Sequence, residues 1–135
     1  MQHVTTWGEH VATTRFQGFV NAADFLRCAN ELAADPSFES MDFLVADFID
    51  ITGHAIDMAS VRDDLAAQAL GARPTNTRYR IVVVTDDRGI EAFTEKMRAL
   101  YAGGGPEIFM FRTREQATLW MDDQEPAPNF RETRY

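Results

Sequence analysis

Three continuous blocks of apolar residues mark the chain, and between them apolar residues recur at helical spacing. The blocks are Phe43–Ala46, Ile81–Val84 and Ile108–Phe111. Continuous apolar runs this short are typical of strands buried on both faces of a parallel sheet. Parallel strands need a crossover, and a right-handed crossover through a helix is the rule. The pattern therefore predicts an α/β fold with three parallel central strands. The expected strands cover residues 42–48, 79–85 and 107–111.

The first residues predict an antiparallel hairpin that joins this sheet. Residues 4–7 and 10–17 are separated by Gly8–Glu9, and the second segment alternates its side chains as a half-exposed strand does. Gly18 and Asn21 are expected to end the second strand. We therefore expect a single domain with a mixed sheet of four to five strands, flanked by about four helices.

Capping residues define the expected helices. Asn21 and Asp57 are good N-cap residues, and Thr113–Gln116 has the spacing of a capping box. Asp35–Pro36 is expected to end the first helix. The segment 49–56, which contains a glycine and several polar residues, is expected to be a loop. The expected helices cover residues 22–34, 58–71, 88–101 and 114–120.

The composition fits one globular domain and argues against several classes of partner. The chain has 135 residues, of which 45% are hydrophobic, and a net charge of -8. Nucleic acids and anionic membrane surfaces are bound through Lys and Arg, so neither is an expected partner. The single cysteine, Cys28, shares the apolar side of its helix and is expected to be buried. No apolar segment has the length of a membrane span, and we expect a cytoplasmic protein.

The domain is expected to cover residues 1–121. Residues 122–135 contain two prolines and little periodicity, so they are expected to form a C-terminal tail that is mobile or packs on a neighbour. The tail ends in aromatic and arginine residues, which are enriched at interfaces, so a homodimer is one expectation.

Acidic residues at predicted strand ends allow two interpretations. Asp47, Asp86 and Asp87 lie at the carboxyl ends of predicted strands, where open α/β sheets place their sites. One interpretation is a phospho-acceptor or Mg²⁺ site that resembles a response-regulator receiver. In that pattern the acidic pair follows an early strand and a Lys follows a late one, whereas here the pair comes late and Arg112 follows the last strand. Helix capping explains the position of Asp87 by itself and is favoured.

His54 is the histidine of most interest, because Asp47, Asp50 and Asp57 are near it in sequence. A histidine with carboxylates can act as a general base or as part of a ligand set. The chain's three histidines do not have a recognisable metal-binding spacing, and a solvated polar loop is favoured. We therefore expect no catalytic residues, no cofactor and no metal. A small hydrolase-like enzyme that uses His54 is the third hypothesis.

Nine of the ten phenylalanines also allow two interpretations. They are Phe16, Phe19, Phe25, Phe38, Phe43, Phe48, Phe93, Phe109 and Phe111. They can fill the core of a small domain, or they can line a pocket for an apolar ligand. The first is favoured, because large apolar residues are normally inside a protein.

Several segments together suggest a family. They are Gly18 before the first helix, Leu44–Asp47, Arg80–Val84, and Glu107–Phe111 followed by Ala117–Trp120. In this order they resemble the SpoIIAA-like group of the STAS superfamily, over about residues 10–121. The resemblance implies a small α/β domain with a mixed sheet. Its better-known members are non-catalytic anti-sigma-factor antagonists that are switched by phosphorylation of a Ser or Thr. Many others are uncharacterised, and some are linked to lipid-binding folds of the Sec14 type.

The switch position of that family can be compared with this chain. The family pattern is Asp-Ser-Ser-Gly at a helix start, with the second Ser phosphorylated. Here Asp57 matches the leading Asp, Ala59 stands in place of the phosphorylated Ser, and Ser60 replaces the Gly. Ser60 on the helix and Thr52 before it are the nearby hydroxyls. A phosphate close to a helix N-terminus is electrostatically favoured, which makes Ser60 the hypothesis for the switch.

We therefore expect a non-catalytic regulatory domain that binds a protein partner. The alternative is a binder or carrier of a small apolar ligand or lipid, held between the sheet and a helix. The expected interaction and switch region consists of Asp47, Asp50, Thr52, Gly53, His54, Asp57 and Ser60.

Overall fold

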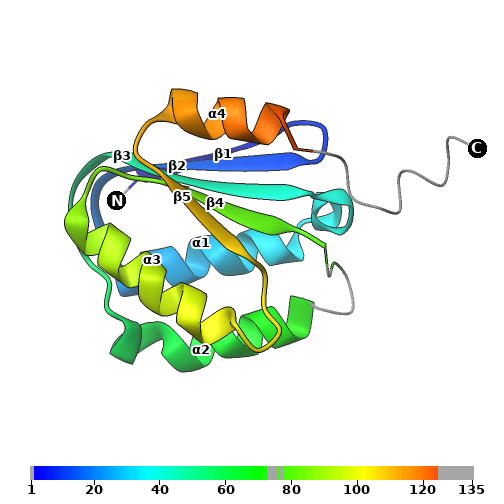
Figure 1. Cartoon of the computed structure of the whole chain (residues 1–135). Coiled ribbons are helices and arrows are strands. Elements are labelled where there is room, and N and C mark those ends of the chain that lie inside the picture. The colour runs from blue at the N-terminus through cyan, green and yellow to red at the C-terminus, as the bar shows by residue number, and fades with distance from the viewer. Residues whose placement is uncertain (1, 73–75, 77, 125–135) are drawn as a thin grey trace, which may run out of the picture.

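A five-stranded mixed sheet forms the centre of the protein (Figure 1). The computed structural model describes residues 2–72, 76 and 78–124. The strands are β1 (Gln2–Trp7), β2 (Val11–Asn21), β3 (Phe43–Ala55), β4 (Arg80–Val84) and β5 (Ile108–Phe111), in the spatial order β1-β2-β3-β4-β5. The pair β1–β2 is antiparallel and the other pairs are parallel. The predicted fold class is confirmed, and Val45, Val82 and Phe109 lie side by side on the three central strands.

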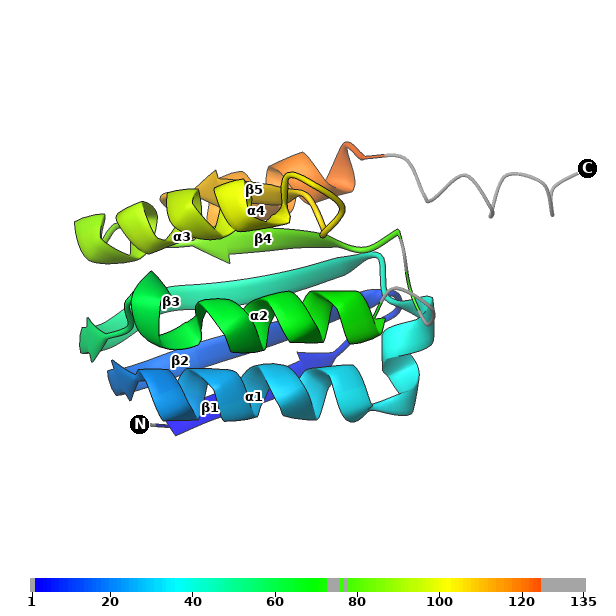
Figure 2. The ribbon, with the colours of Figure 1, turned by 90° about the horizontal axis from the view of Figure 1, so that it is seen from below.

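Helices cover both faces of this sheet, but unequally. The helices are α1 (Ala22–Ala34), the short 3-10 helix η1 (Pro36–Ser40), α2 (Met58–Ala72), α3 (Arg88–Tyr101) and α4 (Arg114–Asp122). Helices α1, α2 and α3 lie on one face, and α4 lies on the other (Figures 1 and 2). In the described part of the chain, none of the helices has both the length and the apolar character needed to cross a bilayer. Residues 125–135, most of the expected tail, lie outside the described residues.

The helices begin where the capping residues predict. Asn21 accepts a hydrogen bond from the backbone N–H of Asp24 at 2.8 Å. Asp57 accepts from Ser60 at 3.0 Å, and Thr113 accepts from Gln116 at 3.1 Å. Each such cap stabilises its helix by about 1 kcal/mol, because it satisfies an N–H group that has no partner within the helix.

Two of the predicted boundaries are wrong, and both errors concern the same pair of strands. β2 does not end at Gly18 but runs to Asn21, and residues 49–55, expected as a loop, are the second half of β3. The two strands stay paired over this length, from Gln17 opposite Asp50 to Asn21 opposite Ala55. Gly18 has a positive φ of 78°, and the register shifts beside it, so the glycine lets the strand bend without ending.

Helix α2 lies farther from the sheet than its two neighbours. In Figure 1 it lies below α1 and α3, and in Figure 2 it lies between them and runs alongside both. It packs mainly on these two helices, through side chains that include the buried Val61 and Leu65. The side chain of Gln68 also donates a hydrogen bond to Asn30 of α1. α2 therefore bridges α1 and α3 from the outside.

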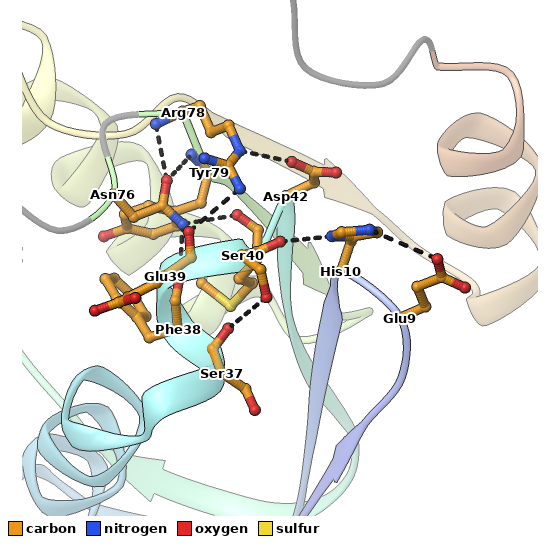
Figure 3. Close-up of polar contacts among 11 residues, drawn as sticks. Glu9, His10, Ser37, Phe38, Glu39, Ser40, Asp42, Asn76, Arg78 and Tyr79 are labelled. Atoms are coloured by element: carbon orange, nitrogen blue, oxygen red, sulfur yellow. Dashed lines mark hydrogen bonds and ion pairs between the residues drawn. The ribbon is translucent and has the colours of Figure 1, made fainter. Parts of the chain in front are cut away.

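A buried asparagine holds the opposite edge of the sheet together (Figure 3). Asn76 is only 3% exposed, and its amide nitrogen donates to the backbone carbonyls of Phe38 and Met41 at 2.8 and 2.7 Å. Its amide oxygen accepts from the backbone N–H groups of Arg78 and Tyr79 at 3.0 and 3.2 Å. This side chain thereby joins the segment before β4 to the segment before β3.

Candidate functional site

The carboxyl edge of the parallel strands is where the expected site residues lie. Helices α2, α3 and α4 all begin at this edge, so their free N–H groups and capping side chains face the same end of the molecule (Figure 1). The sheet, however, divides the expected region into two groups. One group faces α2 and α3, and the other faces α4.

His54 belongs to the group on the α2 and α3 side. Its Nε2 lies 3.3 Å from Oδ1 of Asp87, the residue that caps α3. Its Nδ1 accepts a long hydrogen bond, 3.5 Å, from the backbone N–H of Ile56. In this arrangement Nδ1 is the acceptor and Nε2 faces the Asp87 carboxylate. Both ring nitrogens are engaged, which does not favour the hypothesis that His54 acts as a general base.

Gly89 provides the space that His54 occupies. A Cβ atom at position 89 would lie 2.4 Å from Nε2 of His54 and 3.1 Å from Oδ1 of Asp87. The first distance is far shorter than a van der Waals contact, so any larger residue would displace the imidazole. The pairing of His54 with Asp87 therefore depends on a glycine in the first turn of α3.

The environment of Asp87 favours its ionised form. The backbone N–H of Ile90 donates to its carboxylate at 3.0 Å. This hydrogen bond, followed by that from Gly89 and by the His54 ring, lowers the pKa of Asp87 below its usual value. The side chain is 38% exposed, so its negative charge is also presented to solvent.

The first turn of α2 carries the expected switch residues. Asp57 caps the helix with one carboxylate oxygen, and its second oxygen accepts a hydrogen bond from the hydroxyl of Ser60 at 2.9 Å. Both side chains belong to exposed residues. The Ser60 hydroxyl is thus accessible, but it already has a carboxylate as its neighbour.

Asp47 and Asp50 belong to the second group, on the α4 side of the sheet. The Asp47 side chain is 3% exposed and accepts from Nε of Arg114 at 2.6 Å. The same guanidinium donates to Asp50 at 2.8 Å, and Arg15 lies 3.6 Å from Asp47. The two carboxylates raise the pKa of Arg114 above its usual value, with Asp47 the larger cause. This network fixes the start of α4 to β3, which is a structural role.

Thr52 and Gly53 lie on the paired extension of β3, not on a free loop. Gly53 is opposite Phe19 of β2, and a Cβ at position 53 would lie 3.3 Å from the Phe19 ring. Phe19 is 53% exposed, so the hypothesis that it lines an internal pocket is wrong. Thr52 is also exposed.

The receiver-like interpretation of the acidic residues does not fit this arrangement. Asp47 is neutralised by Arg114 on one side of the sheet, and Asp87 caps α3 on the other. Within the described ranges, His, Cys, Asp and Glu form no group of three or more that is suited to a metal ion. Sequence reasoning missed Arg114 and Gly89. The sequence shows that Arg114 stands at the start of its helix. It does not show that Arg114 binds Asp47, because the two residues are 67 positions apart.

Comparisons with known proteins identify a fold but no sequence family. No protein-family model matches the chain, and no curated protein matches it. Among solved structures, the anti-sigma factor antagonist SpoIIAA in its unphosphorylated form matches with a TM-score of 0.57 at 11% identity, covering 91% of this chain and 100% of that chain. An anti-sigma factor antagonist from Mycobacterium paratuberculosis matches with a TM-score of 0.55 at 13% identity, covering 90% and 94%.

A third solved structure also matches this chain. It is an uncharacterized protein of the DUF3478 family from Shewanella loihica PV-4, described as having a SpoIIAA-like fold. It matches with a TM-score of 0.53 at 13% identity, covering 88% of this chain and 91% of that chain. The chain described here therefore has the SpoIIAA-like fold, as the sequence resemblance predicted.

Proposed function

We propose that this protein is a non-catalytic regulatory domain that binds a partner protein. The binding surface in this proposal is the helix-start surface, formed by Asp57 and Ser60 of the α2 start and Asp86, Asp87 and His54 beside the α3 start. The observation that best supports it is the exposed Asp57–Ser60 pair in the first turn of α2. Two of the structurally similar proteins are anti-sigma factor antagonists, which supports a regulatory role.

The charge of this surface indicates the kind of partner. Asp57 and Asp86 are exposed, and Asp87 is partly exposed and ionised. As defined, the helix-start surface contains three carboxylates and no Lys or Arg, and Arg88 follows Asp87 in the sequence. A partner with a basic surface complements this arrangement, and the complementarity would act mainly on the association rate and on specificity.

Phosphorylation of Ser60 is the switch in this proposal. A phosphate adds about -1.5 to -2 charges at pH 7. On Ser60 it would replace the 2.9 Å hydrogen bond to Asp57 by repulsion between two anions. The N–H groups at the start of α2 would then bind the phosphate in place of Asp57. The first turn would keep a cap, but Asp57 would be released and the surface would become more negative.

The partner surface is tested with a pair of double variants that change charge equally. Asp57→Asn/Asp86→Arg keeps a good N-cap while it removes negative charge from the helix-start surface. Glu39→Gln/Glu107→Arg makes the same charge change at exposed positions near the opposite edge. We expect quantitative pull-down from the native cells to lose partner proteins with the first variant only. Circular dichroism checks that both are folded. Capture of the same partners by the first variant contradicts the proposal, as does the absence of any partner of the unmodified chain.

The switch is tested separately. The protein is incubated with ATP and an extract of the native cells, and peptides are then analysed by mass spectrometry, with Ser60→Ala as the control. We expect a phosphopeptide that contains Ser60 and disappears in the variant. Phosphate found at other positions only, or not at all, contradicts the switch but leaves the partner surface to be judged by the pull-down.

A further inference from the structure

The interior of the protein contains a hollow below α2. Its volume is about 80 Å³, and it lies between the inner face of the central strands and the three helices α1, α2 and α3. Strands β2, β3 and β4 form its floor, α1 and α3 form its sides, and α2 covers it. It is lined by side chains that include Ala29, Leu44, Ala46, Leu65, Phe93 and Met97.

The hollow lies where α2 bridges its neighbours from the outside. α2 packs mainly on α1 and α3, and its Leu65 lines the hollow opposite the central strands. Leu44 and Ala46 show the consequence. Both are on the inner face of the central strand, where full burial is the norm, and both remain partly exposed. The core packs around this space instead of filling it.

Aromatic rings form much of the wall. Phe16 and Phe48 are stacked with their ring centroids 4.6 Å apart, and Phe25 meets Phe93 edge-on at 5.6 Å. These four side chains all line the hollow. Ring faces and ring edges are therefore both available, and these are the geometries that aromatic partners prefer.

The lining contains no ionised side chain. Asp, Glu, Lys, Arg and His are all missing from the described residues that surround the hollow. Both of its threonine hydroxyls already have partners: the Thr94 hydroxyl donates to the backbone carbonyl of Ile90 at 2.7 Å, and the Thr14 hydroxyl forms a hydrogen bond with the Thr5 hydroxyl at 2.8 Å. Burial raises the pKa of Tyr79 to about 12, so its hydroxyl is neutral at pH 7. A charged ligand would lose its hydration without compensation.

We propose that the hollow binds a small neutral molecule built on a single aromatic ring. Its volume sets an upper limit on the size of the ligand. The hollow, at about 80 Å³, has roughly half the volume of an engineered apolar cavity of about 150 Å³ that binds benzene, so a single ring fits only when the wall moves outward, and ligand sites for larger molecules span about 300–1,000 Å³. A lipid is therefore too large. Entry of a ring requires α2 to move outward, and the contacts that resist this are the packing of Val61 and Leu65 and the bond from Gln68 to Asn30. This site is separate from the helix-start surface.

Benzene is the first probe, and two variants report its location. Ala46→Leu places a larger side chain in the hollow, and Ala29→Leu does the same from α1 in case the first variant misfolds. Ala92→Leu makes the matched change at an exposed position of α3. We expect benzene to shift the amide resonances of lining residues with saturation and to raise the Tm. We expect the filling variants to weaken binding at least tenfold, and Ala92→Leu to bind as the unmodified chain does.

Three results would overturn this assignment. The first is that benzene causes no saturable shift up to its solubility limit. The second is that both filling variants bind benzene as tightly as the unmodified chain does. The third is that xenon, a smaller probe, binds and benzene does not. None of these results bears on partner binding, so the two proposals can fail independently.

Discussion

Replacement of the buried Asn76 tests how this fold is held at the edge opposite the site. Asn76→Ala removes a side chain whose amide nitrogen donates twice and whose oxygen accepts twice (Figure 3). Each hydrogen bond contributes about 1 kcal/mol, and a buried group left without a partner costs about 1–3 kcal/mol. Loss of four hydrogen bonds at a site that is 97% buried would reduce the free energy of unfolding by about 4 kcal/mol. The reduction is smaller if water enters the vacated space and forms hydrogen bonds there. We expect a loss of about 3 kcal/mol in the free energy of unfolding.

Two further variants make this prediction specific. Asn76→Asp keeps the acceptor but replaces the donor with a carboxylate oxygen that faces the carbonyls of Phe38 and Met41. It should cost at least as much as Asn76→Ala at pH 7. Part of this cost should be recovered as the pH falls below about 4, because a protonated carboxyl can again donate. Lys96→Ala, on the exposed face of α3, is the control and should stay within about 0.5 kcal/mol.

Equilibrium urea unfolding, followed by circular dichroism, measures these differences. The transition midpoint should fall while the m-value stays the same, because the area exposed on unfolding is hardly changed. A loss below about 1 kcal/mol for Asn76→Ala would refute the calculation. So would an Asn76→Asp variant that is more stable at pH 7 than at pH 4, relative to the unmodified protein at each pH.

Three other predictions concern charged and titrating groups. Asp47→Ala should lower the free energy of unfolding, measured in urea, by about 2–3 kcal/mol, because a buried carboxylate bound to Arg114 is lost. Asp50→Ala should lower it by less than about 1 kcal/mol, because the Asp50 side chain is 44% exposed. Equal losses for the two variants would contradict the network. Because the pKa of Asp87 is lowered in the folded protein, its carboxylate stabilises the fold above about pH 4, and this contribution is lost as the pH falls. Asp87→Ala should therefore reduce the free energy of unfolding by about 1 kcal/mol at neutral pH and by less below pH 4. A constant difference from pH 3 to 7 would contradict this prediction. Burial raises the pKa of Cys28 to about 11, so its labelling by a thiol reagent at pH 8 should be slow until urea unfolds the chain; fast labelling of the folded protein would contradict its burial.

The site was only partly predictable, because its residues are joined by contacts between distant segments. The sequence placed Asp57, Ser60 and His54 near the start of α2, and each is found there. It did not predict that β2 and β3 remain paired to Ala55, since that pairing depends on hydrogen bonds between segments about 34 residues apart. It also grouped Asp47 and Asp50 with His54, although the sheet separates them. A strand alternates its side chains between two faces, and a bulge changes that alternation, so closeness in sequence did not give closeness in space.

The hydrophobic pattern by itself determined the three central strands, the class of fold and the starts of the helices. Those features depend on local propensity and on side chains within a few residues of one another, so a single sequence contains the information for them. The tertiary structure alone decided that Asp47 pairs with Arg114, that Gly89 makes room for His54, and that α2 leaves a hollow above β3. These features depend on the distances between packed elements, and those distances result from many contacts between side chains that are far apart in the sequence.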